Sequence, residues 1–276
     1  MNSENQKFIE TANGRIYYFL DQPYPERPTV IFLHGLSANH TTGDNITDAL
    51  RHFQLNFLLP DLRGHGHSDK SKNKDFYKLS VFTEDLKKII QQENLSKVIL
   101  IGYSFGGYIA LDYAAKNPAS VASLILISAN HVNPLVYKKL GFLTKPVYAT
   151  INFLAWLLLW QKRNQYAYYD QKTATGYFNS TFTGFTTMPL SVNLWMLAEV
   201  FKLDLSRDIA NIACPTLIAR SKGDLFFSAG EACDMAKKIP SARIFTIKKA
   251  THFLASRHQE NIIEFITDFL KKERLI

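Results

Sequence analysis

The sequence predicts an α/β fold, with a mostly parallel central sheet flanked by helices and a helical cap insertion. Short apolar runs alternate with stretches of helical spacing, as in repeated strand–helix–strand units. The runs are apolar at consecutive positions rather than at alternate ones, which indicates strands buried on both faces. The alternation is interrupted once, between residues 131 and 210.

The expected elements follow in chain order, and each apolar run has the length of a short buried strand. The expected strands are 30–33, 55–59, 98–101, 124–127, 216–219 and 243–247. The expected helices are 46–52, 81–93, 105–115, 229–238 and 261–272. Strands joined through helices in this way lie parallel, with right-handed crossovers.

Residues 131–210 show no convincing strand–helix repeat and are rich in aromatic side chains. All three tryptophans, Trp156, Trp160 and Trp195, lie there. We therefore expect a helical, aromatic-rich cap over an α/β core formed by residues 1–130 and 211–276.

The composition excludes several classes of protein. Hydrophobic residues make up 46% and charged residues 20%, which excludes a disordered chain. The net charge is +8, but the lysines are scattered, so no nucleic-acid partner is expected. The two cysteines form neither a disulfide framework nor a metal-type spacing. The polar N-terminus lacks the apolar core of a secretory signal, so we expect a cytoplasmic protein.

The most specific chemical motif is Gly-x-Ser-x-Gly at residues 102–106, after an expected strand and before an expected helix. A nucleophile elbow needs this layout, because the sharp turn strains the serine backbone and the glycines avoid clashes. Ser104 would lie at a helix N-terminus, where N–H groups favour developing negative charge. We therefore expect Ser104 to be a catalytic nucleophile.

A serine hydroxyl needs a base, and the base needs an orienting acid. After a nucleophile elbow, the acid and the histidine follow in that order. Asp224 comes shortly after the expected strand 216–219, whereas the segment after the preceding strand ends in Asn130 and holds no carboxylate. Asp224 is therefore the expected acid.

The expected base is His252, which follows the strand 243–247 by a short loop. This position lies at the carboxyl edge of the sheet, where sites of α/β proteins lie. The other histidines after Ser104 are His131, at the start of the insertion, and His258, which is expected at the surface.

The oxyanion of an acyl-transfer reaction needs two backbone donors. We expect the N–H groups of Phe105, next to the nucleophile, and of Leu36, in the loop after the strand 30–33. His34, in the same loop, is expected to bond the loop rather than to act on substrate.

Taken together, these motifs resemble the α/β-hydrolase superfamily. The segments that carry the resemblance are Phe32-Leu-His-Gly35, Asp61-Leu-Arg-Gly-His-Gly-His-Ser-Asp69, Gly102-Tyr-Ser-Phe-Gly-Gly107, Gly223-Asp224 and His252-Phe253. The resemblance covers about residues 14–130 and 211–270 and implies a serine esterase or lipase, with a monoacylglycerol-lipase-like branch as one option. The insertion matches the variable cap of the family by position only.

We expect a serine hydrolase that cleaves carboxylic esters with an apolar acyl group, acylglycerol-type esters included, through an acyl-enzyme. Neither a cofactor nor a metal is required. An aromatic cap over a triad favours apolar ligands, and the expected substrate-binding residues are Phe153, Trp156, Phe182 and Trp195.

Other chemistries share this scaffold. A carbon–carbon bond hydrolase acting on a vinylogous diketone is one alternative, and a non-catalytic ligand-binding protein is another. His65, His67 and Asp69 are also similar to the start of a zinc site. Lys70 follows where a histidine would be needed, so we expect His65 and His67 to be hydrogen-bonded loop residues.

The stretch 146–160 is apolar except for Thr150 and Asn152, and lysines precede it. A helix apolar on nearly all sides must be covered by protein or lipid. Apolar bulk with tryptophans and basic flanks suits an interfacial segment. The sequence leaves two alternatives for this segment. It makes peripheral contact with a lipid surface, or it is buried as a packed cap helix or in a dimer contact.

Overall fold

The structure is a computed structural model that describes residues 5–12, 14–161, 184–248 and 259–276. The strands are β1 (Gln6–Thr11), β2 (Gly14–Asp21), β3 (Thr29–Leu33), β4 (Asn56–Pro60), β5 (Val98–Tyr103), β6 (Val121–Ile127), β7 (Thr216–Ser221) and β8 (Ala242–Ile247). The helices are α1 (Asp44–Leu50), α2 (Leu79–Gln92), α3 (Phe105–Lys116), α4 (Pro134–Tyr137), α5 (Thr144–Leu157), α7 (Leu190–Val200), α8 (Ala229–Lys238) and α9 (Gln259–Lys272).

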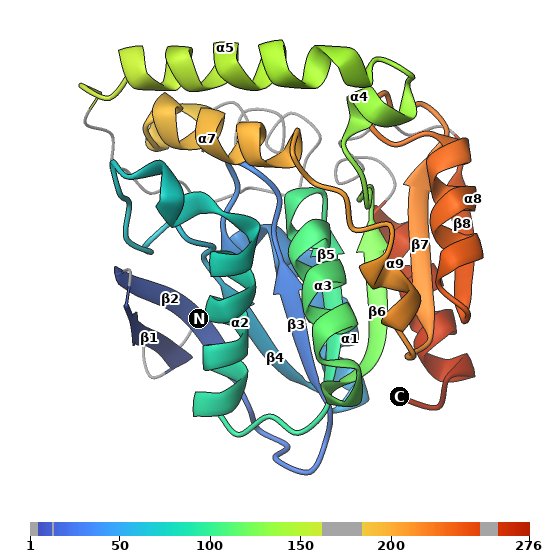
Figure 1. Ribbon diagram of the computed structural model, residues 1–276. Helices are drawn as coiled ribbons and strands as arrows, with labels where there is room; N and C mark the ends of the chain where they lie inside the picture. The colour runs from blue at the N-terminus through green and yellow to red at the C-terminus, as the bar shows by residue number, and fades with distance from the viewer. Residues whose placement is uncertain (1–4, 13, 162–183, 249–258) are drawn as a thin grey trace.

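All of these strands belong to one sheet with the order β1-β2-β4-β3-β5-β6-β7-β8 (Figure 1). The six strands β3 to β8 are parallel to one another, whereas β2 runs antiparallel to both of its neighbours, β1 and β4. The predicted fold class is therefore confirmed, and the six predicted strands are β3 to β8. The prediction lacks β1 and β2, which form an antiparallel hairpin at one edge of the sheet.

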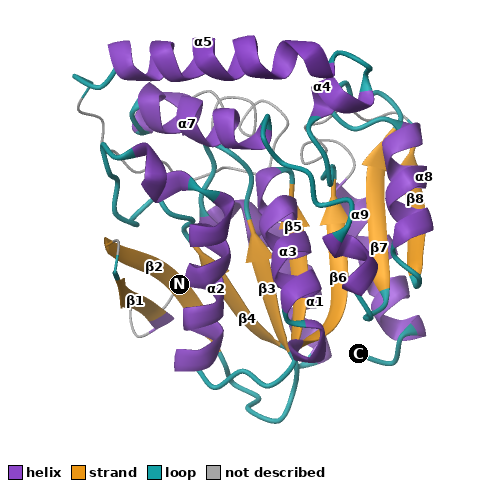
Figure 2. Cartoon of the chain, in the orientation of Figure 1, coloured by secondary structure: helices purple, strands orange, loops and turns teal. Residues whose placement is uncertain are grey.

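Helices cover both faces of the sheet (Figure 2), and this explains why the apolar runs have no polar alternation. In β5, Val98 and Leu100 lie in the core cluster to which α2, α3 and α8 contribute. Ile99 and Ile101 lie in the other core cluster, to which α1 and α9 contribute. Successive residues of a strand point to opposite faces, so both faces of β5 require apolar side chains.

The described residues between β6 and β7 include α4, α5 and α7, in agreement with the predicted helical insertion. The two ends of the insertion are paired, since Asn133 N–H donates to the Leu203 carbonyl and Leu205 N–H donates to the His131 carbonyl, both over 2.8 Å. The boundaries of a separate cap domain stay a prediction. None of the helices in the described segments is long and apolar enough to cross a membrane.

Candidate active site

Ser104 occupies the sharp turn between β5 and α3. Its backbone φ is 49° and its ψ is −112°, a region that residues other than glycine seldom adopt. Its N–H donates to the Ile127 carbonyl at the end of β6 over 2.9 Å, which fixes the turn to the neighbouring strand. Strain of this kind persists only where the surroundings impose it, and it is frequent at functional sites.

The glycines around Ser104 are required because backbone segments approach one another closely. A Cβ added at Gly102 would lie 2.6 Å from the Cα of Gly107, and one added at Gly106 would collide with the Leu33 carbonyl at the end of β3. Any side chain at these two positions would therefore push α3 away from the sheet. The local geometry of the predicted nucleophile elbow is present.

The loop after β3 lies directly beside the serine. A Cβ added at Gly35 would be 3.4 Å from the Cβ of Ser104. The next residue, Leu36, is half-buried, and Phe105, the first residue of α3, is buried. The two backbone segments predicted to supply oxyanion donors thus flank the same side chain.

Two buried histidines hold this loop. His34 Nε2 accepts the Leu62 N–H over 2.9 Å, and His34 Nδ1 lies 2.8 Å from the Gly35 carbonyl. His65 Nε2 accepts the Ser37 N–H over 3.1 Å. Burial lowers the pKa of His34 to about 4 and that of His65 well below its usual value, so both rings are neutral and each can accept one hydrogen bond.

These contacts confirm that His34 bonds the loop. Both ring nitrogens of His65 are also engaged, because Nδ1 lies 3.1 Å from the Arg63 carbonyl, so this ring does not serve as a zinc ligand. In the part of the chain that the structure describes, no cluster of potential ligands could hold a metal ion.

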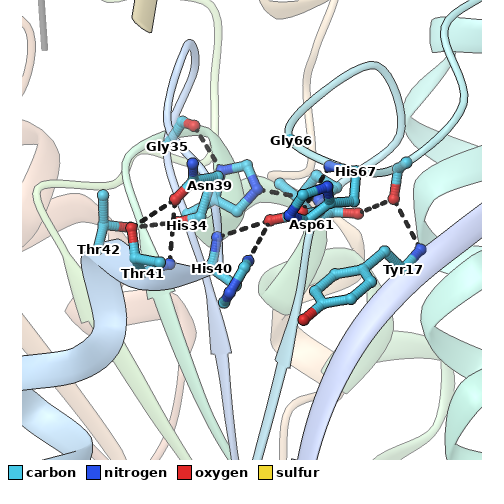
Figure 3. A network of polar contacts seen from close by, with 12 residues as sticks. Tyr17, His34, Gly35, Asn39, His40, Thr41, Thr42, Asp61, Gly66 and His67 are labelled. Carbon is cyan, nitrogen blue, oxygen red and sulfur yellow. Dashed lines mark hydrogen bonds and ion pairs between the residues drawn. The ribbon is translucent and has the colours of Figure 1, made fainter. Parts of the chain in front are cut away.

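Asp61, just after β4, is the centre of the polar network that supports these loops (Figure 3). Its Oδ1 accepts the backbone N–H of His40 over 2.8 Å and lies 2.7 Å from His40 Nδ1. Its Oδ2 accepts the His67 N–H over 2.7 Å. Burial alone would raise the pKa of Asp61, but the hydrogen bonds and the adjacent His40 hold it at about 2, so the group is a carboxylate at neutral pH.

The predicted acid, Asp224, lies in the turn that follows β7. It is buried, and its Oδ1 accepts the N–H groups of Phe226 and Phe227 over 2.8 and 3.0 Å. These two bonds fix the carboxylate at the carboxyl edge of the sheet, the edge that also bears Ser104. Asn130, at the alternative acid position after β6, instead donates to Glu231.

Of the histidines that follow Ser104, His131 is buried, with Nε2 3.0 Å from the Asp234 carboxylate on α8. The predicted base, His252, and also His258 lie outside the described residues. The triad and the oxyanion hole therefore stay predictions. Ser104 and Asp224 follow β5 and β7, and the loop that contains Leu36 lies beside Ser104.

The predicted substrate-binding residues are found in different surroundings. Phe153 and Trp156 lie on α5, are 58% and 61% exposed, and stack on each other at 6.0 Å between ring centroids. Trp195, on α7, is buried and stacks on Tyr77 at 5.8 Å. Phe182 lies outside the described residues. The exposure of Phe153 and Trp156 gives no support to a role in lining a pocket, and the predicted role stays untested.

One contact near the site has no counterpart in the sequence-based prediction. Ser37, beside the expected oxyanion donor, donates its hydroxyl to Asn193 Oδ1 of α7 over 2.5 Å. Both side chains are buried, and Asn193 Nδ2 has no hydrogen-bond partner among the described groups. Because the two residues lie 156 positions apart, no local pattern could have revealed the contact.

Comparison with known families gives a match to residues 28–258, and the matching model is that of the alpha/beta hydrolase fold. Among curated proteins, the chain is similar to a putative esterase/lipase of Haemophilus influenzae, with 27% identity over 255 residues, covering 89% of this chain and 84% of that protein.

Solved structures show the same architecture. An enol-lactonase of Burkholderia xenovorans superposes with a TM-score of 0.76 at 19% identity, covering 96% of this chain and 100% of the other. An esterase of Exiguobacterium antarcticum superposes with a TM-score of 0.73 at 21% identity, covering 96% and 99%. At this level of identity the likeness extends to the fold alone.

Proposed function

The chain belongs to the α/β-hydrolase fold family, and from this premise we propose that it is a serine esterase with the triad Ser104, His252 and Asp224. The observation that carries the proposal is the strained backbone of Ser104 at the N-terminus of α3, beside the loop after β3. Hydrolase activity agrees with the family and with the esterase names of its relatives.

The sheet order supports the choice of acid and base. Ser104 follows β5, Asp224 follows β7, and His252 comes five positions after the end of β8 in the sequence. β5 and β7 are separated by β6 alone, so their ends lie about 10 Å apart at ordinary strand spacing. Serine, imidazole and carboxylate side chains together bridge a gap of that size.

In the proposed mechanism His252 removes the proton from the Ser104 hydroxyl as the oxygen attacks the ester carbonyl carbon. The negative oxygen is held by the N–H groups of Leu36 and Phe105. The tetrahedral intermediate collapses, the alcohol leaves with the proton from the imidazolium, and the acyl group stays on Ser104. A water molecule, deprotonated by His252, then releases the carboxylic acid. Asp224 orients the imidazole and stabilises its charged form.

The proposed substrate is a carboxylic ester with an apolar acyl group, acylglycerol-type esters included. The apolar character of the insertion above the carboxyl edge supports this choice. Carbon–carbon bond cleavage and ligand binding without catalysis remain as alternatives. The cytoplasmic location stays a prediction as well.

Covalent labelling tests the nucleophile. A fluorophosphonate should label the wild-type chain once, and Ser104→Ala should abolish the label while the matched variant Ser96→Ala, at an exposed serine before β5, keeps it. A label retained in Ser104→Ala would refute the assignment. A panel of p-nitrophenyl esters of increasing acyl length should show turnover that rises with acyl length, whereas a preference for vinylogous diketones would favour the carbon–carbon bond hydrolase.

A further inference from the structure

The outer face of α5 is apolar and open to solvent. Ile151 and Ala155 are its buried residues, and they face the rest of the insertion. The large exposed apolar side chains on the other side of α5 and in its flanking turns are Phe142, Phe153, Leu154, Trp156, Leu157 and Trp160. We call this set the α5 face.

The size of the α5 face sets it apart from ordinary surface. Phe142 and Trp160 are 75% and 74% exposed, and Phe153 and Trp156 are more than half exposed. With ~150–250 Å² for each complete aromatic side chain, the four rings expose roughly 400–650 Å² together. This total is comparable with the largest apolar patch on a typical monomer, about 300–600 Å², and such patches are often functional.

The charges around the α5 face indicate what kind of partner it binds. Lys138, Lys139 and Lys145 are exposed at its N-terminal end, and none of them forms an ion pair with a residue that the structure describes. The sequence has no Asp or Glu between His131 and Tyr169. The lysines lie near Phe142 at one end of α5, and Trp156 and Trp160 lie at the other end. Exposed rings and exposed lysines on one surface match an interface with anionic headgroups, where rings enter the acyl boundary and lysines meet phosphates.

The α5 face also lies on the functional side of the fold. α5 is the outermost element above the carboxyl edge of the sheet, and α7 lies between it and the strands (Figure 1). Two further exposed apolar residues, Leu225 at 79% and Phe226 at 58%, directly follow Asp224. Lys138 donates to the Leu225 carbonyl over 3.2 Å, so this turn lies next to the basic end of the α5 face.

We propose that the α5 face binds the surface of a lipid membrane that carries anionic headgroups and turns the carboxyl edge of the sheet toward it. The contact is peripheral. Binding does not depend on the proposed hydrolysis, but it would bring an ester embedded in the membrane to the side of the fold that bears Ser104.

The test is flotation of the full-length chain carrying Ser104→Ala, so that binding is measured without turnover. The vesicles are phosphatidylcholine with and without phosphatidylglycerol. The protein should float with the anionic vesicles at low salt. A Phe142→Ser, Trp156→Ser, Trp160→Ser variant should bind at least tenfold more weakly. The matched control Phe8→Ser changes an exposed ring on β1, 47% exposed, and should bind as before.

The contribution of the three lysines to vesicle binding is tested separately. A Lys138→Gln, Lys139→Gln, Lys145→Gln variant should lose about fivefold in affinity for each lysine on anionic vesicles, and the loss should shrink at high salt. Circular dichroism and thermal melting confirm that each variant is folded.

The proposal is overturned if the protein stays with the soluble fraction, or if the aromatic variant floats as well as the Phe8→Ser control. It is also overturned if light scattering shows a dimer that the aromatic variant dissociates, without vesicle binding, because the α5 face would then join two copies. Fluorophosphonate labelling of the wild type is read independently, so failure of docking and failure of the proposed esterase are distinguishable.

Discussion

Asp61→Asn should destabilise the protein, because the Asp61 carboxylate ties together the loops on either side of β4. Both of its oxygens accept hydrogen bonds, from His40 on one side and from the His67 N–H on the other. Asparagine replaces one of these oxygens with an NH₂ donor, which must face another donor in a site with no exposure to solvent. Loss of a charge-assisted hydrogen bond of this kind costs about 2–3 kcal/mol.

The pKa of Asp61 gives an independent value for the contribution of its carboxylate to the free energy of unfolding. The Asp61 carboxyl group has a pKa of about 2 in the folded chain against an ordinary 3.8, a difference that corresponds to about 2.5 kcal/mol of stability at neutral pH. Because the folded pKa is the lower one, this contribution is complete above about pH 5 and decreases as the pH falls through 3.8 toward 2. About half of it should be lost by pH 3, and most of it by pH 2.

The assay is urea unfolding of wild type and Asp61→Asn at neutral pH and at several values between pH 5 and pH 2.5. The difference in unfolding free energy should be about 2–3 kcal/mol at neutral pH and should narrow steadily on acidification. Asp48→Asn, a matched change at an exposed carboxylate on α1, should show neither effect. A difference that is absent at neutral pH, or that stays constant down to pH 2.5, would refute the reasoning.

Three further variants test other parts of the fold. Asp85→Ala removes the carboxylate that pairs with the fully buried Arg63 guanidinium and should cost about 3–5 kcal/mol in urea unfolding, while Asp75→Ala, in an exposed pair, should change little. Gly106→Ala should abolish ester turnover and lower the melting temperature, because the added methyl group meets the backbone at the end of β3. Asn193→Leu removes the contact of α7 with the loop after β3 and should lower kcat roughly tenfold or more through misplacement of the Leu36 donor, with a melting temperature close to that of wild type. Unchanged turnover in Gly106→Ala or Asn193→Leu would contradict the placement of the oxyanion loop.

The fold could be predicted largely because the central strands carry their signal locally. A strand covered on both faces needs consecutive apolar residues, and β3 to β7 follow that rule. β8 is an edge strand, and Ile247 is its buried residue, but its sequence Arg-Ile-Phe-Thr-Ile is apolar enough to indicate a strand. β1 fails the rule because it is an edge strand in which Ile9 is the buried residue. The sequence of β2 does predict a strand. Ile16 to Leu20 are five apolar residues in succession, all of them buried, and they follow an Asn-Gly dipeptide of the kind that forms hairpins.

Some features of the candidate site are specified by residues close together in the sequence, and others depend on residues far apart. The Ser104 turn depends on Gly102 and Gly106, two positions to either side, so a short motif specifies it. The support of the loop after β3, the proposed source of one oxyanion donor, depends on residues that lie far apart in the sequence, such as Ser37 and Asn193. A single sequence carries no signal for such a pair, because the contact exists only after α7 has packed over the sheet.

The direction of the cap side chains could not be predicted for a different reason. α5 is apolar on nearly all sides, so its sequence has no polar face that would show which side packs inward. The structure shows that Ile151 and Ala155 pack inward, which turns Phe153 and Trp156 outward. α7 lies between α5 and the strands (Figure 1), and it contacts the loop after β3 through Asn193. If the proposed esterase mechanism holds, the inner side of α7 is the part of the described insertion best positioned to contact the acyl group. The exposed rings of α5 then need a partner of their own, and a lipid surface is one that the neighbouring lysines would also bind.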